Sequence, residues 1–150
     1  MADSDMIKLY SGRILELAAS IPLTTRLTDP DATVRKRSPL CGSTVTVDMT
    51  VQGGVVAAFG QDVKACALGQ AAAAVVGGNI VGRSEQEVRN AQQQLRAMLK
   101  DAGPVPEAPF DGFEVLEPAR DYKNRHASIM LTLDAAVEAF AQVRATQDAQ

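Results

Sequence analysis

The sequence predicts an α+β fold, in which an N-terminal helix precedes a three-stranded antiparallel sheet and further helices follow. Three observations support this prediction. Apolar and polar residues alternate through residues 44–51, as in a strand with one buried face. Gly53-Gly54 directly after that run indicates a tight hairpin. From residue 67 onward the apolar residues recur at helical spacing.

The first predicted helix begins at Ser4 or Asp5, because either side chain can cap it, and Pro22 ends it. Residues 22–33 are polar and predict a connection. Strands are predicted at 34–38, 44–51 and 55–63, and their short links favour an antiparallel meander. The apolar side of the first helix is formed by Ile7, Tyr10, Ile14, Leu17 and Ile21.

Four helices are predicted after the sheet. The first covers 67–76 and ends at Gly77-Gly78, read as a C-cap. The second opens with a capping box, Ser84 to Glu87, and ends at Gly103-Pro104. A short helix is predicted at 110–116 and a long one at 125–143. Core positions are Val88, Ala91, Leu95, Met98 and Leu99 in the second, and Ile129, Leu133, Val137 and Phe140 in the last.

Length and composition predict one domain over residues 1–150, with flexible ends at about 1–4 and 145–150. The net charge of −3 and the 4% of aromatic residues argue against a nucleic-acid partner. No apolar run approaches the roughly 20 residues that span a bilayer, which argues against a membrane protein. The acidic start lacks the basic region of a signal peptide, so a cytoplasmic location is expected.

Two cysteines stand in settings that suit a ligand or a reactive thiol. Cys41 lies in the turn-forming run from Ser38 to Ser43, directly before the alternating strand. Cys66 lies where the third strand gives way to a helix, and a helix start favours a thiolate. In a reducing compartment, two such cysteines indicate thiols or metal ligands rather than a structural disulfide.

The order and setting of these cysteines resemble the NifU/IscU/SufU family of iron–sulfur cluster assembly scaffolds. That family has a first cysteine in Asn-Pro-x-Cys-Gly-Asp before a strand, a second at a helix start, and a third near the start of a C-terminal helix. The resemblance extends from about Met6 to Phe140. Three departures matter: Ser38 replaces the asparagine, Ser43 replaces the aspartate, and the third cysteine is missing.

Two registers are open for the missing cysteine. The family's Arg-x-x-Cys pattern aligns Arg125 with its arginine and Ser128 with the cysteine. The IscU branch has a histidine just before the cysteine, and aligning His126 with it would place Ala127 at the ligand position. Neither register supplies a thiol.

The resemblance implies C-terminal helices packed on one face of the sheet, and a binding protein rather than an enzyme. It implies a scaffold-like role in iron–sulfur cluster assembly, binding iron or a cluster, or accepting persulfide sulfur on Cys66 or Cys41 from a cysteine desulfurase. Recipient apo-proteins would be further partners. The alternative is a zinc- or iron-binding regulatory protein, or a desulfurase partner that no longer builds clusters and holds no cofactor.

The ligand set is incomplete in each of these readings. Cys41, Cys66 and His126 would form a three-ligand site suited to zinc or iron. Ser43 and Ser128 stand at the positions of lost family ligands, and a serine hydroxyl is a poor ligand at neutral pH. A [2Fe–2S] centre takes four ligands, so serine and histidine would complete the set, or two subunits of a homodimer would supply two thiols each.

Overall fold

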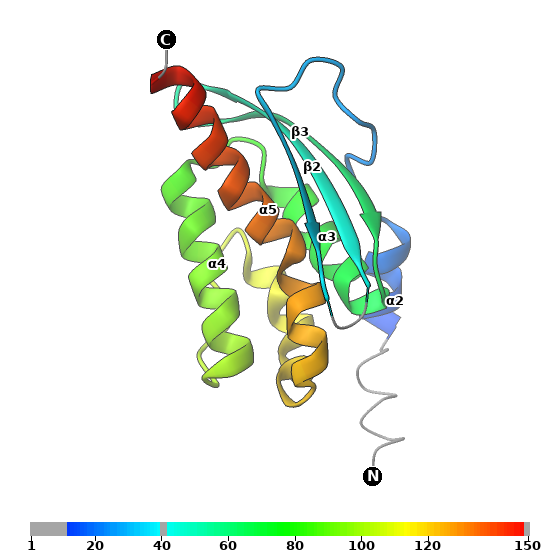
Figure 1. Ribbon diagram of the computed structural model, residues 1–150. Coiled ribbons are helices and arrows are strands. Elements are labelled where there is room, and N and C mark those ends of the chain that lie inside the picture. The colour runs from blue at the N-terminus through cyan, green and yellow to red at the C-terminus, as the bar shows by residue number, and fades with distance from the viewer. Residues whose placement is uncertain (1–11, 40–41, 149–150) are drawn as a thin grey trace.

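The computed structural model describes residues 12–39 and 42–148 and confirms the α+β prediction. One side of the three-stranded sheet is covered by helices, among which the long α5 lies directly against the strands (Figure 1). The elements in chain order are α2 (Gly12–Ala19), β1 (Ala32–Arg37), β2 (Thr44–Gln52), β3 (Val55–Lys64), α3 (Ala67–Asn79), α4 (Glu85–Lys100), the 3₁₀ helix η1 (Asp111–Asp121) and α5 (Lys123–Asp148).

The sheet has the order β1-β2-β3 with both neighbouring pairs antiparallel, as the meander predicts. Gly53 and Gly54 form the β2–β3 turn, and both have positive φ, which glycine adopts without strain. At the opposite end of the hairpin, Thr44 pairs with Arg37 on one side and Lys64 on the other. That end of the sheet leads into α3 and carries the β1–β2 connection.

The alternation in β2 separates an inner from an outer face of the sheet. Val45, Val47 and Met49 are at most 1% exposed and face the helices. The predicted core side of α4 is confirmed as well, since all five of its predicted positions are buried. None of the described helices is both long enough and apolar enough to cross a membrane.

The predicted polar connection lies on the outer face of the sheet, where it is anchored on Asp48. We call residues 22–31 the outer segment. The fully buried Asp48 carboxylate accepts hydrogen bonds from Arg26 (Nε, 2.6 Å), the Leu27 amide (3.0 Å) and Thr33 Oγ1 (2.7 Å). Burial alone would raise the pKa of Asp48, but these bonds and the Arg26 charge outweigh it, so the pKa lies below its ordinary value.

The prediction that α3 ends at Gly77-Gly78 is wrong, because the helix continues to Asn79. Gly77 is buried within the helix, where a Cβ would lie 2.7 Å from Gln61 Nε2 and 3.0 Å from Pro22 Cγ. The glycine therefore serves close packing of α3 against β3 and the outer segment. A turn containing Gly82, with φ of +91°, follows the helix.

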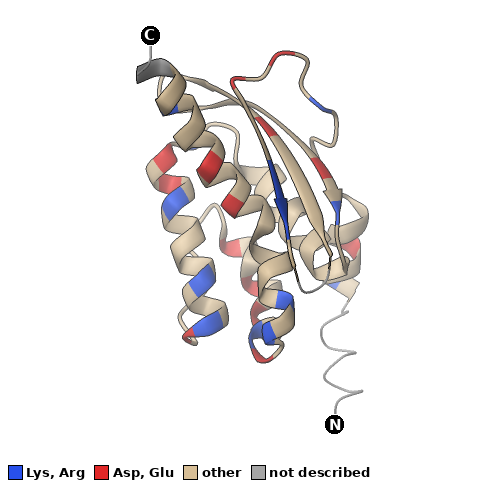
Figure 2. Ribbon diagram, in the orientation of Figure 1, with Lys and Arg blue, Asp and Glu red and all other residues tan. Residues whose placement is uncertain are grey.

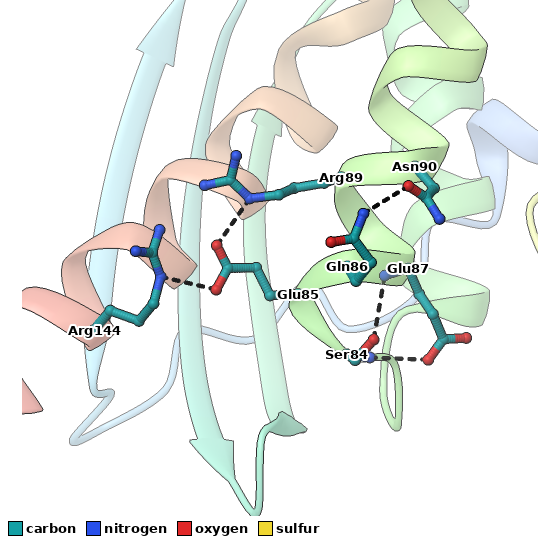
Figure 3. A network of polar contacts seen from close by, with 7 residues as sticks. All are labelled: Ser84, Glu85, Gln86, Glu87, Arg89, Asn90 and Arg144. Atoms are coloured by element: carbon teal, nitrogen blue, oxygen red, sulfur yellow. Dashed lines mark hydrogen bonds and ion pairs between the residues drawn. The ribbon is translucent and has the colours of Figure 1, made fainter.

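The predicted capping box at the start of α4 is confirmed (Figure 3). Ser84 Oγ accepts from the Glu87 amide at 3.2 Å, and the Glu87 carboxylate accepts from the Ser84 amide at 3.1 Å. Beside it, Glu85 accepts from Arg89 of the same helix and from Arg144 of α5. This shared carboxylate links the start of α4 to the last turns of α5.

The last two helices are longer than predicted. The helix expected at 110–116 is a 3₁₀ helix that continues through Pro118 to Asp121. The C-terminal helix begins at Lys123 and continues through Asp148, beyond the predicted limits of 125 and 143. The predicted positions Ile7 and Tyr10 lie outside the described residues.

Candidate functional site

Cys66 lies between the end of β3 and the first turn of α3, where the sequence predicts it. It is the N-cap residue of α3, and its side chain makes no capping hydrogen bond. Its carbonyl accepts from the Gln70 amide at 2.9 Å, which fixes the residue to the helix start. The residue is partly exposed, and its Sγ lies 3.5 Å from Ser128 Oγ. The Cys66 thiol is thus hydrogen-bonded to a serine hydroxyl on another helix.

Ser128 connects Cys66 to Ser43. The Ser128 hydroxyl donates to Ser43 Oγ across 3.0 Å, and the two residues are 1% and 4% exposed. Ser43 immediately precedes β2, whereas Ser128 lies in the second turn of α5. Cys66, Ser128 and Ser43 therefore form one hydrogen-bonded cluster, which we call the Cys66 cluster.

Gly69 makes this close approach of α3 and α5 feasible. A Cβ at this position would lie 2.6 Å from Ser128 Oγ and 3.2 Å from the Ser128 carbonyl oxygen. The first distance is shorter than carbon–oxygen contacts allow and the second is tight, so a larger residue would push Ser128 away from Cys66. Sequence reasoning did not single out Gly69, although a glycine inside an alanine-rich helix is a signal for close packing.

The connection that carries Cys41 is closed by backbone hydrogen bonds. The Ser38 amide donates to the Ser43 carbonyl at 2.8 Å, and the Gly42 amide donates to the Ser38 carbonyl at 3.0 Å. Gly42 has a φ of +69°, in the left-handed region that glycine favours. Cys41 itself lies outside the described residues, so its proximity to Cys66 stays a prediction.

The structure brings the Ser128 hydroxyl into contact with Cys66, whereas the His126 ring lies against backbone carbonyls of η1. Two residues on an α-helix differ by about 200° around its axis, so His126 and Ser128 point to nearly opposite sides. The His126 Nε2 lies 3.1 Å from the Ala119 carbonyl and 3.0 Å from the Arg120 carbonyl. Since carbonyls only accept, Nε2 carries the proton, and a metal could bind this ring only at Nδ1 or by breaking both bonds.

Among residues 12–39 and 42–148, no group of three or more His, Cys, Asp or Glu side chains is arranged to hold a metal ion. The described part of the predicted ligand set is thus the Cys66 thiol, the hydroxyls of Ser43 and Ser128, and the His126 ring, whose Nε2 bonds backbone carbonyls of η1. Chemically, such an arrangement is suited to a thiol whose position is fixed by hydrogen bonds to neighbouring hydroxyl groups.

Comparison with solved structures finds the same fold in other proteins. A nitrogen-fixing NifU-like protein (N-terminal) from Brucella abortus is 44% identical, with a TM-score of 0.91 over 93% of this chain and 97% of that one. A putative iron–sulfur cluster assembly scaffold protein for the SUF system from Fervidobacterium islandicum AW-1 shares the fold, with 16% identity and a TM-score of 0.79 over 89% and 97% of the two chains. No family model and no curated protein matches the sequence significantly.

Proposed function

Because the chain belongs to the NifU-like group of the NifU/IscU/SufU-type family, we propose that it serves iron–sulfur cluster assembly as a scaffold-like sulfur acceptor. In this proposal it is a binding protein of the cytoplasm rather than an enzyme. A cysteine desulfurase delivers sulfur to it, and recipient apo-proteins take the sulfur or the cluster onward. Iron or a cluster is the cargo of the site.

The observation that carries the proposal is the hydrogen bond between Cys66 and Ser128. Ser128 lies where the Arg-x-x-Cys pattern of the family expects a cysteine, and its hydroxyl is 3.5 Å from the Cys66 thiol. A hydroxyl there is a poor iron ligand, but it is a good hydrogen-bond donor to a thiolate. The Cys66 cluster therefore favours a role in which Cys66 accepts sulfur, rather than one in which a single subunit supplies a complete set of thiolate ligands.

The proposed transfer conserves atoms and charge. The Cys66 thiolate attacks the terminal sulfur of the desulfurase persulfide, forming a Cys66 S–S bond, while the S–S bond of the donor breaks. The donor cysteine leaves as a thiolate, and the transferred sulfur keeps its proton. The sulfane sulfur keeps its oxidation state, so no external oxidant or reductant is needed.

The two serines supply the hydrogen bonds that this step needs. Ser128 has a single hydroxyl proton, which it donates to Ser43, so the neutral Cys66 thiol is the donor in its contact with Ser128. When Cys66 loses its proton, the Ser128 hydroxyl can rotate and donate to the thiolate. The helix start of α3 favours the same negative charge.

Mass spectrometry of the intact protein after incubation with a cysteine desulfurase and cysteine tests the proposal. A mass increase of one sulfur atom is expected on the native chain and on Cys41→Ser, but not on Cys66→Ser. Ser128→Ala should accept sulfur more slowly, whereas the exposed control Ser20→Ala should match the native chain. Failure of the native chain to acquire sulfur would contradict the acceptor role.

Metal and labile-sulfide analysis of anaerobically purified protein separates the cargo alternatives. Iron and sulfide in equal amounts would support a cluster scaffold. Zinc alone would support the regulatory alternative, in which the thiols hold a metal but build no cluster. Protein without metal that still accepts sulfur would support a relay of sulfur alone.

A further inference from the structure

A basic surface lies on the outer face of the sheet beside the Cys66 cluster. Arg37 of β1, Thr44 of β2 and Lys64 of β3 pair in one row across the sheet. Residues paired across a sheet point to the same face, and the neighbouring Val45 points inward, so this row points outward. With strands about 4.8 Å apart, Arg37 and Lys64 begin about 10 Å from each other.

The next row of the outer face adds Arg35 and one carboxylate. Arg35 pairs with Thr46, which pairs with Asp62. Arg35, Arg37 and Lys64 are exposed, and among the described residues they make no ion pair and no side-chain hydrogen bond. Figure 2 shows this basic end of β1 and β3. We call Arg35, Arg37 and Lys64 the basic sheet end.

The outer segment leaves this end of the sheet uncovered. It crosses the outer face at Asp48 and at Gly60, where a Cβ would lie only 2.5 Å from the Thr25 carbonyl oxygen. Asp48 and Gly60 pair with each other two residues farther along β2 and β3 than Thr46 and Asp62. Within residues 12–39 and 42–148, no backbone therefore covers the rows nearest the Cys66 cluster, as the exposure of their basic side chains indicates.

We infer that the basic sheet end is the docking surface for a protein that presents carboxylates next to the group it exchanges with Cys66. This inference rests on the proposed function and identifies that protein as the sulfur-donating desulfurase. The whole chain carries a net charge of −3, so a cluster of unpaired cations on it is a local feature rather than a general property. Lys64 precedes Cys66 by two residues, so a partner held by these cations has its own surface beside the thiol.

Charged residues on an edge strand also discourage pairing with other sheets. That role applies to β1 and β3, which are the two edge strands, but carboxylates serve it equally and it does not favour one sign over the other. The outermost row carries the same sign on both strands, Arg37 on β1 and Lys64 on β3, and the carboxylate of Asp62 lies one row farther from the Cys66 cluster. Complementary charge chiefly raises the association rate and fixes the orientation of the partners.

Binding of the full-length chain to a cysteine desulfurase from the same organism, measured by biolayer interferometry, tests the inference. The test variant is Arg37→Glu with Lys64→Glu, and the matched control is Arg13→Glu with Lys100→Glu. Both pairs change exposed residues that have no ion pair within the described part of the chain, and both shift the net charge equally. The test variant should bind about 10-fold or more weakly, while the control stays within about 2-fold of the native chain.

Two further measurements vary the salt concentration and replace the desulfurase with a small sulfur donor. Raising NaCl from about 50 to 300 mM should weaken binding of the native chain more than binding of the test variant. Glutathione persulfide needs no docking surface, so, supplied in excess, it should load Cys66 of the native chain and the test variant to the same final extent. Equal losses of desulfurase binding in the test and control variants, or no loss in either, would overturn the docking inference. So would a native chain that is loaded by glutathione persulfide but does not bind the desulfurase. Failure of Cys66 to accept sulfur from either donor would instead overturn the proposed function.

Discussion

Ser128 and Ser43 are 85 positions apart in the sequence, yet their hydroxyl oxygens lie 3.0 Å apart in the interior. Their contact joins the start of β2 to α5, and Cys66 adds the start of α3 through its own contact with Ser128. A pair of serines therefore occupies the junction of three elements, where the family pattern predicts an aspartate and a cysteine.

Replacing Ser43 with Asp and Ser128 with Cys should increase cluster binding. The two changes supply a carboxylate and a thiol within a few ångström of Cys66, and with Cys41 they bring the thiol count to three. After anaerobic reconstitution with iron and sulfide, the double variant should show stronger visible charge-transfer absorption than the native chain.

A surface-thiol control decides whether the location of the added thiol matters in that experiment. Ser20→Cys adds a thiol on an exposed residue and should leave the absorption at the native level. Equal, negligible absorption in the double variant and the native chain would mean that the site cannot hold a cluster even with its ligands restored.

Cys66 should react faster than Cys41 with iodoacetamide in metal-free protein at neutral pH. The N-terminus of α3 and the Ser128 hydroxyl both favour negative charge on the Cys66 sulfur, and the residue is partly exposed. Peptide mass spectrometry after brief treatment ranks the two thiols directly. Faster labelling of Cys41 would transfer the acceptor role to the β1–β2 connection.

Gly69→Ala should destabilise the protein, because its Cβ would press on both the side chain and the backbone of Ser128. Such overpacking costs about 1–3 kcal/mol. Gly78→Ala is the matched control on the same helix, since nothing lies within 4 Å of its Cβ position. That variant should gain up to ~1 kcal/mol from helix propensity. Urea unfolding measures both, and a neutral Gly69→Ala would contradict the described contact.

Asp48→Asn should lower stability at neutral pH by about 2 kcal/mol, because an amide accepts fewer hydrogen bonds and offers Arg26 no charge. The pKa of Asp48 in the native state lies below its ordinary value, so its ionised form stabilises the fold above about pH 4. That contribution is lost as the pH falls through the native pKa.

The difference in stability between the native chain and Asp48→Asn should therefore shrink on acidification below about pH 4. Glu85 and Glu87 also have lowered pKa values and add their own acid dependence, but it is common to both proteins and cancels in the difference. Asp29→Asn, an exposed change in the same outer segment, should leave stability unchanged at every pH. A constant difference for Asp48→Asn across this range would mean that its charge is unimportant.

Local patterns in the sequence predicted most of the fold. The alternation in β2, the glycine turn and the capping box at Ser84 each involve residues close in the chain, and all three are confirmed. The local sequence around Gly77 predicts a helix end, and this prediction is wrong. Gly77 instead allows α3 to pack closely against Pro22 and Gln61, which are far away in the sequence.

The candidate site was predictable only in part, because some of its contacts join residues that are far apart in the sequence. The motifs identified Cys66, Ser43 and Ser128 as neighbours through the family pattern, and the structure brings these three together. His126 shares a helix turn with Ser128, but only the helical angle and the carbonyls of Ala119 and Arg120 reveal where its ring points. The role of Gly69 depends on how closely α5 approaches α3, and the residues around Gly69 in the sequence do not predict that approach.

The position of α5 has a consequence for the order in which the protein is made. This helix is the last described element, yet it contacts β1, β2, α3 and α4 and carries Ser128. A nascent chain that has emerged only as far as Lys100 contains Cys66 and all three strands, but not the helix that packs against β1 and β2. Cys66 therefore acquires its serine neighbour only when α5 leaves the ribosome, after the whole sheet has been made.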